Sequence, residues 1–207
     1  MNITILLIFA GAVLWWLVSH YKTRSNTPSD LSVLPEHFVV FDLETTGLDS
    51  STHEIIEIGA IRVNRDSTEH DTFQALVIPK GRIGTRITEL TGITKEMVAA
   101  EGEILDHVLA EFREFIGDLP MVAFNAPFDA GFLRAACVST STCQFTNEIY
   151  CALDMARRAW PGRDNYRLAG LAKDGNLSDA DTHRALGDCQ RAMIVYCAAA
   201  SILGTHR

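Results

Sequence analysis

Two acidic side chains interrupt an otherwise apolar, strand-forming stretch in the first quarter of the chain. Residues 38–44 read FVVFDLE, so Asp42 and Glu44 are separated by one residue. In a β-strand, side chains two residues apart point to the same face of the sheet. At about 4 Å and an effective dielectric constant of 20, two such carboxylates repel each other by about 4 kcal/mol. A fold that contains this strand must supply a cation, a proton or solvent beside the pair, and a solvated sheet face is one open interpretation.

The hydrophobic pattern around this stretch predicts an α/β domain. Further strand-like segments follow at Ile55–Val63, Phe73–Ile78 and Met121–Phe124. The turn-like residues between the first three strands favour an antiparallel meander. Apolar residues at helical spacing cover residues 103–116, a segment after Pro127, residues 148–159 and 167–173, and a last segment from about Arg184 to Leu203. This order of elements predicts a mixed β-sheet flanked by helices.

The charge balance excludes a protein that holds nucleic acid by bulk positive charge. The chain has 18 basic and 26 acidic residues, a formal net charge of −8. A local basic segment nevertheless occurs at residues 157–173, where the single acid is Asp164. Its basic residues are Arg157, Arg158, Arg163, Arg167 and Lys173. This segment is interpreted either as a contact to a phosphate backbone or as a solvated helix face.

An almost unbroken apolar run covers residues 3–18 and ends near Trp15 and Trp16. As a helix it would be about 24 Å long, against about 30 Å for a bilayer core. Lys22 and Arg24 follow directly, which favours a single-pass anchor at residues 1–20 with the rest of the chain in the cytoplasm. A cleaved signal peptide and a soluble packing helix are the alternatives. Polar residues 21–36 are predicted to be a linker, and residues 37–207 the folded domain.

Two later motifs carry further candidate site residues. Asp129 ends the sequence NAPFD (125–129), where it would lie in the first turn of a helix that follows a strand. The helix dipole favours an acid there, but such junctions are also where α/β folds place ligand groups. His183 and Asp188 lie five residues apart, about 140° around one helix. We therefore expect His183 in the loop before the last helix and Asp188 on the inward face of that helix.

Together these motifs resemble those of the DEDDh, or DnaQ-like, 3′–5′ exonucleases, which include polymerase proofreading domains and RNase T. The segments FDLETTG (41–47) and NAPFD (125–129), then His183 and Asp188, occur in the family's order and approximate spacing. The segments ITELTGIT and ARRAWPG also look like family segments. The resemblance covers about residues 37–200 and implies a ribonuclease H-like fold. Phe124 departs from the pattern, because many relatives have His there, which puts site support and substrate fit in question.

The resemblance also implies a role for each candidate residue. Two Mg²⁺ ions, for which Mn²⁺ would substitute, would be held by Asp42, Glu44, Asp129 and Asp188. His183 would act as the general base. The 3′ end of the substrate would be bound by Thr45, Thr46, Gly47 and His183.

The activity implied in this way is metal-dependent hydrolysis of phosphodiester bonds at the 3′ ends of single-stranded or frayed DNA or RNA. Two alternatives remain open at this point. One is a proofreading subunit of a DNA polymerase. The other is a catalytically inactive interaction module on the same scaffold, which the presence of all four acids and the histidine disfavours.

Overall fold

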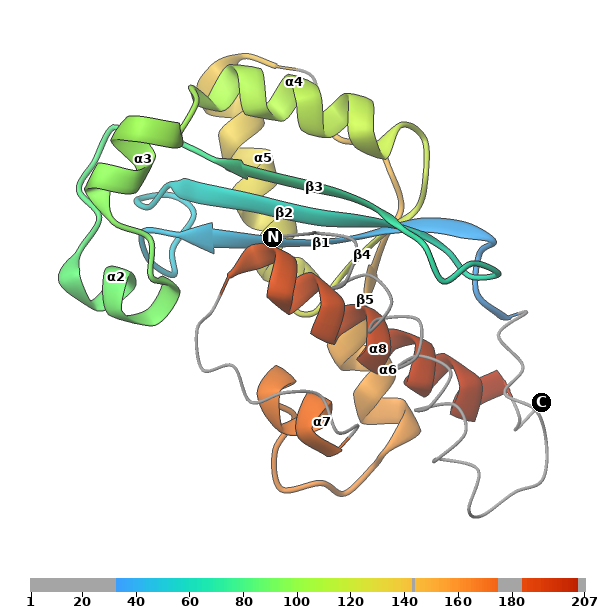
Figure 1. Cartoon of the computed structure of the whole chain (residues 1–207). Coiled ribbons are helices and arrows are strands. Elements are labelled where there is room, and N and C mark those ends of the chain that lie inside the picture. Colours follow the sequence, from blue (N-terminus) through green and yellow to red (C-terminus); the bar gives the residue numbers. More distant parts are fainter. Residues whose placement is uncertain (1–32, 143, 175–183, 205–207) are drawn as a thin grey trace.

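A five-stranded mixed sheet lies between two groups of helices in the computed structural model, which describes residues 33–142, 144–174 and 184–204 (Figure 1). The strand order is β3-β2-β1-β4-β5. The strands are β1 (His37–Thr45), β2 (Ile55–Asn64), β3 (Asp71–Leu76), β4 (Met121–Ala123) and β5 (Ile149–Cys151). The first three pair antiparallel, whereas β4 pairs parallel with β1 and β5 with β4. The predicted meander and the predicted mixed sheet are both confirmed.

The helices divide between the two faces and one end of the sheet. Figure 1 shows α4 (Leu105–Ile116) and α5 (Ala126–Thr140) on one face. The opposite face is covered by α6 (Ala152–Ala159), α7 (Leu168–Asp174) and α8 (Ala185–Gly204). The short helices α2 (Thr85–Thr91) and α3 (Lys95–Glu101) lie together at one end of the sheet.

The side chains of β1 alternate between the two faces of the sheet, so this strand contributes to both hydrophobic cores and fixes which face Asp42 and Glu44 occupy. Val39, Phe41 and Leu43 are buried in the cluster that includes residues of α4 and α5. Phe38 and Val40 are buried in the second cluster, with residues of α8. Burying each such side chain contributes about 1.5–3 kcal/mol, so the register of β1 is strongly determined. Asp42 and Glu44 continue the even-numbered series and therefore belong to the face that α8 covers.

Two parts of the fold differ from the sequence prediction. The expected helix over residues 148–159 begins with strand β5, because Tyr150 and Cys151 pair with Val122 and Ala123 of β4. Helices α2 and α3 were not predicted, since seven residues give too short a periodic pattern. The start of α3 is nevertheless capped in a regular way, because the hydroxyl of Thr94 accepts a hydrogen bond from a backbone N–H at 3.2 Å.

The predicted membrane anchor is corrected by the structure. The run 3–18 itself lies outside the described residues. Among the described residues, no helix is both long and apolar enough to cross a membrane. This finding contradicts the predicted single-pass, membrane-anchored protein, so the N-terminal hydrophobic helix and the membrane contact are not retained.

Candidate active site

Asp42 and Glu44 lie near the carboxyl end of β1, on the face that α8 covers. Asp42 is partly exposed, whereas Glu44 is only 8% exposed. Across the antiparallel pair, Asp42 faces Gly59 of β2 and Glu44 faces Glu57. The glycine leaves the space beside Asp42 free of a side chain, so another element can approach the sheet there.

The first turn of α8 fills that space and brings in a third acid. Asp188 is buried, and its backbone N–H donates to the carbonyl of Arg184 in the helical pattern. One carboxylate oxygen from each of Asp42, Glu44 and Asp188 lies within 4.8 Å of the other two. Arg191, one turn later, donates to Asp188 at 2.9 Å and partly balances the negative charge.

Asp129 approaches the same place from the start of α5. Its side chain is 3% exposed, and the backbone N–H groups of Asp129 itself and of Leu43 stabilise its charged form. Leu43 separates Asp42 from Glu44 along β1, and Asp129 is the strongest charged neighbour of Asp42. Asp129 therefore acts on Asp42 from the start of α5, beside the three carboxylates of Asp42, Glu44 and Asp188 that β1 and α8 bring together.

The environment of these acids opposes their ionisation when no cation is present. Burial, and then the charge of Asp188, raises the pKa of Glu44 to about 8. Burial also raises the pKa of Asp129 to about 7. The pKa of Asp42 is raised well above its usual range, by burial and then by Asp129 and Asp188. A clustered, oxygen-only set of ligands of this kind fits a hard divalent cation such as Mg²⁺ or Mn²⁺.

The predicted general base is His183, which directly precedes Arg184 in the chain. His183 lies outside the described residues, as do the expected capping residues Asp181 and Thr182. Arg184 is described and directly precedes α8. The role of His183 therefore stays a prediction.

The predicted substrate turn, residues 45–47, follows the first two acids and is held by local hydrogen bonds. The hydroxyl of Thr45 donates to the carbonyl of Gly47 at 2.6 Å, and Thr46 Oγ1 lies 3.2 Å from Nδ1 of His53. A Cβ atom at Gly47 would lie 2.4 Å from the His53 ring. A side chain at residue 47 would therefore require the exposed His53 ring to move, a contact that sequence reasoning missed.

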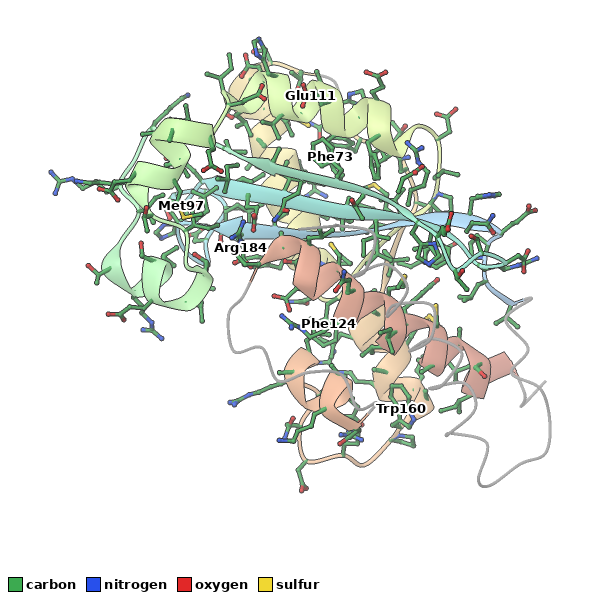
Figure 2. The ribbon with its side chains drawn as sticks, in the orientation of Figure 1. Phe73, Met97, Glu111, Phe124, Trp160 and Arg184 are labelled. Carbon is green, nitrogen blue, oxygen red and sulfur yellow. The ribbon has the colours of Figure 1, made fainter. Side chains whose placement is uncertain are left out.

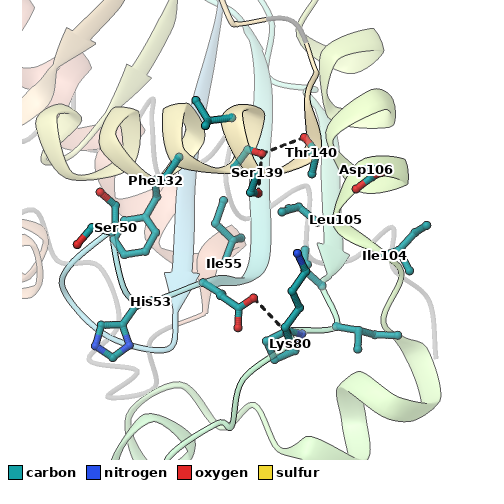
Figure 3. Close-up of a pocket in the computed structure, with 18 of the residues that line it drawn as sticks. Ser50, His53, Ile55, Lys80, Ile104, Leu105, Asp106, Phe132, Ser139 and Thr140 are labelled. Atoms are coloured by element: carbon teal, nitrogen blue, oxygen red, sulfur yellow. Dashed lines mark hydrogen bonds between the residues drawn. The ribbon is translucent and has the colours of Figure 1, made fainter.

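A pocket of about 890 Å³ borders this turn on the α4 and α5 side of the sheet (Figure 3). Its lining includes Ser50, His53 and Lys80, together with Phe132 of α5, and none of the four acids. Glu54 also lines the pocket, and its carboxylate accepts a hydrogen bond from the backbone N–H of Lys80 at 3.1 Å. The pocket is adjacent to the predicted 3′-end turn but separate from the carboxylate cluster.

The basic segment and Phe124 have structural partners of their own. Arg157 pairs with Asp154, and Arg163 pairs with Asp174, so part of the positive charge of residues 157–173 is already balanced. Phe124 packs against the clusters formed by α6, α7 and α8, and Figure 2 shows it on that side of the sheet with Trp160. Phe124 therefore supports the packing behind the site.

Three charged residues around the acids were not assigned from the sequence. They are Glu57, Arg184 and Arg191. Glu57 is fully buried and pairs with Arg184, which Figure 2 shows at the beginning of α8 beside the sheet. The signal that could have found Glu57 is its position in an apolar strand, two residues before a glycine, with the same period as Asp42 and Glu44.

The chain is similar to known proteins over most of its folded part. Residues 39–196 match the RNase T family model, described as an exonuclease. The chain is 38% identical over 177 residues to a PolC-type DNA polymerase III of Clostridium perfringens, covering 84% of this chain but only 12% of that protein. It is 36% identical over 167 residues to the DNA polymerase III subunit epsilon of Aquifex aeolicus, covering 81% of this chain and 79% of that protein.

A solved structure shares the fold. The zinc-bound complex of E. coli exonuclease I with single-stranded DNA superposes with a TM-score of 0.67 and 19% identity, covering 83% of this chain and 41% of the other. The sheet and its flanking helices therefore form the ribonuclease H-like exonuclease fold.

Proposed function

Because the chain belongs to the RNase T family of DnaQ-like exonucleases, we propose that it removes nucleotides one at a time from the 3′ ends of single-stranded or frayed nucleic acids. The observation that carries this proposal is the cluster of Asp42, Glu44 and Asp188, which each offer a carboxylate oxygen within 4.8 Å of the other two, with Asp129 as a charged neighbour of Asp42. We assign the exonuclease domain to residues 37–207, since β1 begins at His37.

The ligands for divalent ions in this proposal are the four carboxylates. Asp42, which has the other three acids as charged neighbours, would contact two ions, and Glu44, Asp129 and Asp188 would complete their shells. When bound, a pair of Mg²⁺ ions, or Mn²⁺ in their place, would neutralise the phosphate and lower the pKa of a water molecule. Exonucleases of this family use divalent ions, and the oxygen-only ligand set supports the choice of Mg²⁺.

The remaining steps fall to other residues of the chain. His183 takes the proton of the attacking water, since an imidazole of ordinary pKa is mostly neutral above pH 7 and can accept it. The turn at Thr45, Thr46 and Gly47 holds the terminal nucleotide through its backbone, next to the acids on β1. The water oxygen bonds to phosphorus as the bond between phosphorus and the 3′ oxygen of the preceding nucleotide breaks. That oxygen takes a proton from solvent and becomes a 3′ hydroxyl, and the terminal residue leaves as a 5′-mononucleotide.

A second candidate is the proofreading subunit of a DNA polymerase. It is favoured by the similarity to subunit epsilon of Aquifex aeolicus, which this chain covers over 79% of that protein's length. This function uses the same site but requires a polymerase partner. It predicts faster removal of a mismatched than of a paired 3′ nucleotide, and co-purification with the catalytic polymerase subunit.

The direct test of the proposed reaction is a digestion of matched DNA and RNA oligonucleotides labelled at the 5′ end, with Mg²⁺, with Mn²⁺ and with EDTA. A ladder that shortens from the 3′ end only when metal is present supports the proposal, and the faster substrate identifies the preferred sugar. Immediate release of the labelled terminal nucleotide would show the opposite direction and contradict it. The matched control is Asp42→Asn, which we expect to leave the oligonucleotide intact.

A further inference from the structure

The first turn of α8 is seated on strand β2 by a set of contacts that the reaction described above does not use. Glu57 and Gly59 are two residues apart on β2 and lie opposite Glu44 and Asp42 of β1. Both therefore face α8, on the same side of the sheet as the acids. Because α8 carries Asp188, whatever seats α8 on β2 also sets the distance between Asp188 and the two acids of β1.

Glu57 holds this helix through its carboxylate. The Glu57 side chain has no exposed surface. Its Oε2 accepts the backbone N–H of Ala185, the first residue of α8, at 3.0 Å. Its Oε1 accepts a hydrogen bond from Arg184 at 2.6 Å and one from Gln74 of β3 at 2.9 Å. A buried carboxylate with this set of donors binds strand β2 to the residue before α8 and to its first backbone N–H group.

Gly59 is the second residue of β2 that holds the first turn of α8 in place. A Cβ atom at this position would lie 2.6 Å from the backbone of Ala185 and of Leu186, which is closer than any relaxed contact. The Cys189 thiol, one turn further along α8, donates to the carbonyl of Gly59 at 3.2 Å. The helix backbone thus rests directly on the strand, and any side chain at residue 59 would push the helix away.

Glu57 also forms an ion pair with Arg184, whose positive charge lies beside the acids. Arg184 directly precedes α8, and its ion-pair partner Glu57 lies opposite Glu44 across the pair of β1 and β2. Glu57 binds the guanidinium with three contacts of 2.6–3.2 Å and neutralises it. Without Glu57, this cation would lose its ion pair beside the cluster and would be free to compete with a metal ion for Glu44.

We propose that Glu57 is a positioning residue of the metal centre: with Gly59 it seats the first turn of α8 on β2, so that Asp188 meets Asp42 and Glu44 and Arg184 is held off the cluster. This inference rests on the proposed function for its consequence, which is metal binding. The seating itself can be tested without any nuclease activity.

The experiment compares the wild-type protein with two variants. Glu57→Gln removes the negative charge that binds Arg184, and Gly59→Ala adds a Cβ atom that clashes with the backbone of α8. Mn²⁺ binding is measured directly by electron paramagnetic resonance at a temperature where each variant is folded. We expect both variants to bind Mn²⁺ at least about tenfold more weakly, the loss typical when a group that orients metal ligands is removed. Hydrogen exchange should become faster in the peptide 184–192 and stay unchanged in α4 and α5.

The matched control is Glu54→Gln, because Glu54 also accepts two backbone N–H groups, those of Lys80 and Gly81, but lies away from α8. We expect it to lower stability while leaving Mn²⁺ affinity unchanged. Wild-type Mn²⁺ affinity in Glu57→Gln, or an increase in exchange spread evenly over the domain, would overturn the inference. Failure of the wild-type protein to bind Mn²⁺ would instead overturn the proposed function, and the exchange data would still decide whether Glu57 seats α8.

Discussion

Replacing Glu44 with glutamine should stabilise the metal-free protein, although it removes a proposed ligand. Burial and the neighbouring acids raise the pKa of Glu44 from 4.5 to about 8. At pH 7 the unfolded chain carries an ionised Glu44, whereas the folded metal-free protein must hold that group protonated. This shift in the pKa of Glu44 lowers the free energy of unfolding of the metal-free protein by about 3 kcal/mol at pH 7 and by about 5 kcal/mol well above pH 8. A neutral isostere avoids this cost, which is a large fraction of a typical domain stability of roughly 5–15 kcal/mol.

The sign of the pH dependence follows from the direction of the pKa shift. The folded-state pKa lies above the unfolded one, so the stability contributed by Glu44 is fully present below pH 4.5 and is lost as the pH rises toward about 8. The advantage of Glu44→Gln should therefore be about 1 kcal/mol at pH 5 and should grow with pH.

Urea unfolding in EDTA, at half-unit steps from pH 5 to 8.5, measures this difference. Added Mn²⁺ should reverse the order, because the wild-type protein gains binding free energy that the variant loses. The matched control is Glu89→Gln at an exposed position of α2, which should change stability by less than about 0.5 kcal/mol. A Glu44→Gln protein with wild-type stability at every pH, or one that is less stable at pH 8, would refute the electrostatic description of the site.

Three other outcomes are expected. Asp42→Asn should abolish the rise in melting temperature that Mn²⁺ produces in the wild-type protein, measured by calorimetry, and an unchanged rise would contradict its place at the centre of the cluster. His183→Ala should lose at least about a hundredfold in kcat, within the range for removal of a general base, while its Mn²⁺ affinity in a titration stays at the wild-type value. Gly47→Ala should cost less than about 1 kcal/mol of stability, because the exposed His53 ring can move aside, yet should raise KM for an oligonucleotide more than it lowers kcat.

Much of the fold was predictable because its elements have clear periodic patterns. The alternation along β1 is dictated by apolar residues on both faces, so the direction of Asp42 and Glu44 followed from the sequence. Strand β5 was missed because three half-buried residues directly before a helix carry no period of their own, and only pairing with β4 defines them. Short helices such as α2 depend in the same way on tertiary packing.

The carboxylate cluster was predictable in composition but not in detail. Motif order pointed to Asp129 and Asp188, yet the contact of Asp129 with the backbone of Leu43 arises only when α5 packs against β1. Glu57 was missed because its partner, Arg184, lies far away in the chain. Arg191 was missed because its contact with Asp188, one helical turn earlier, is one of many possible charge pairs on a helix. Gly47 was assigned to close approach of a nucleotide, which stays a prediction, and the structure adds a contact with the His53 ring that the sequence did not reveal.

The most direct test of the central assignment is the anomalous diffraction of crystals soaked in Mn²⁺, which locates the ions independently of activity. We expect two anomalous peaks within coordination distance of the Asp42 carboxylate, with Glu44, Asp129 and Asp188 sharing the remaining contacts. If Asp42 binds both ions, both peaks should disappear in crystals of Asp42→Asn soaked in the same way. Anomalous density elsewhere, with the four carboxylates bound only to water and to Arg191, would contradict the metal-dependent exonuclease site.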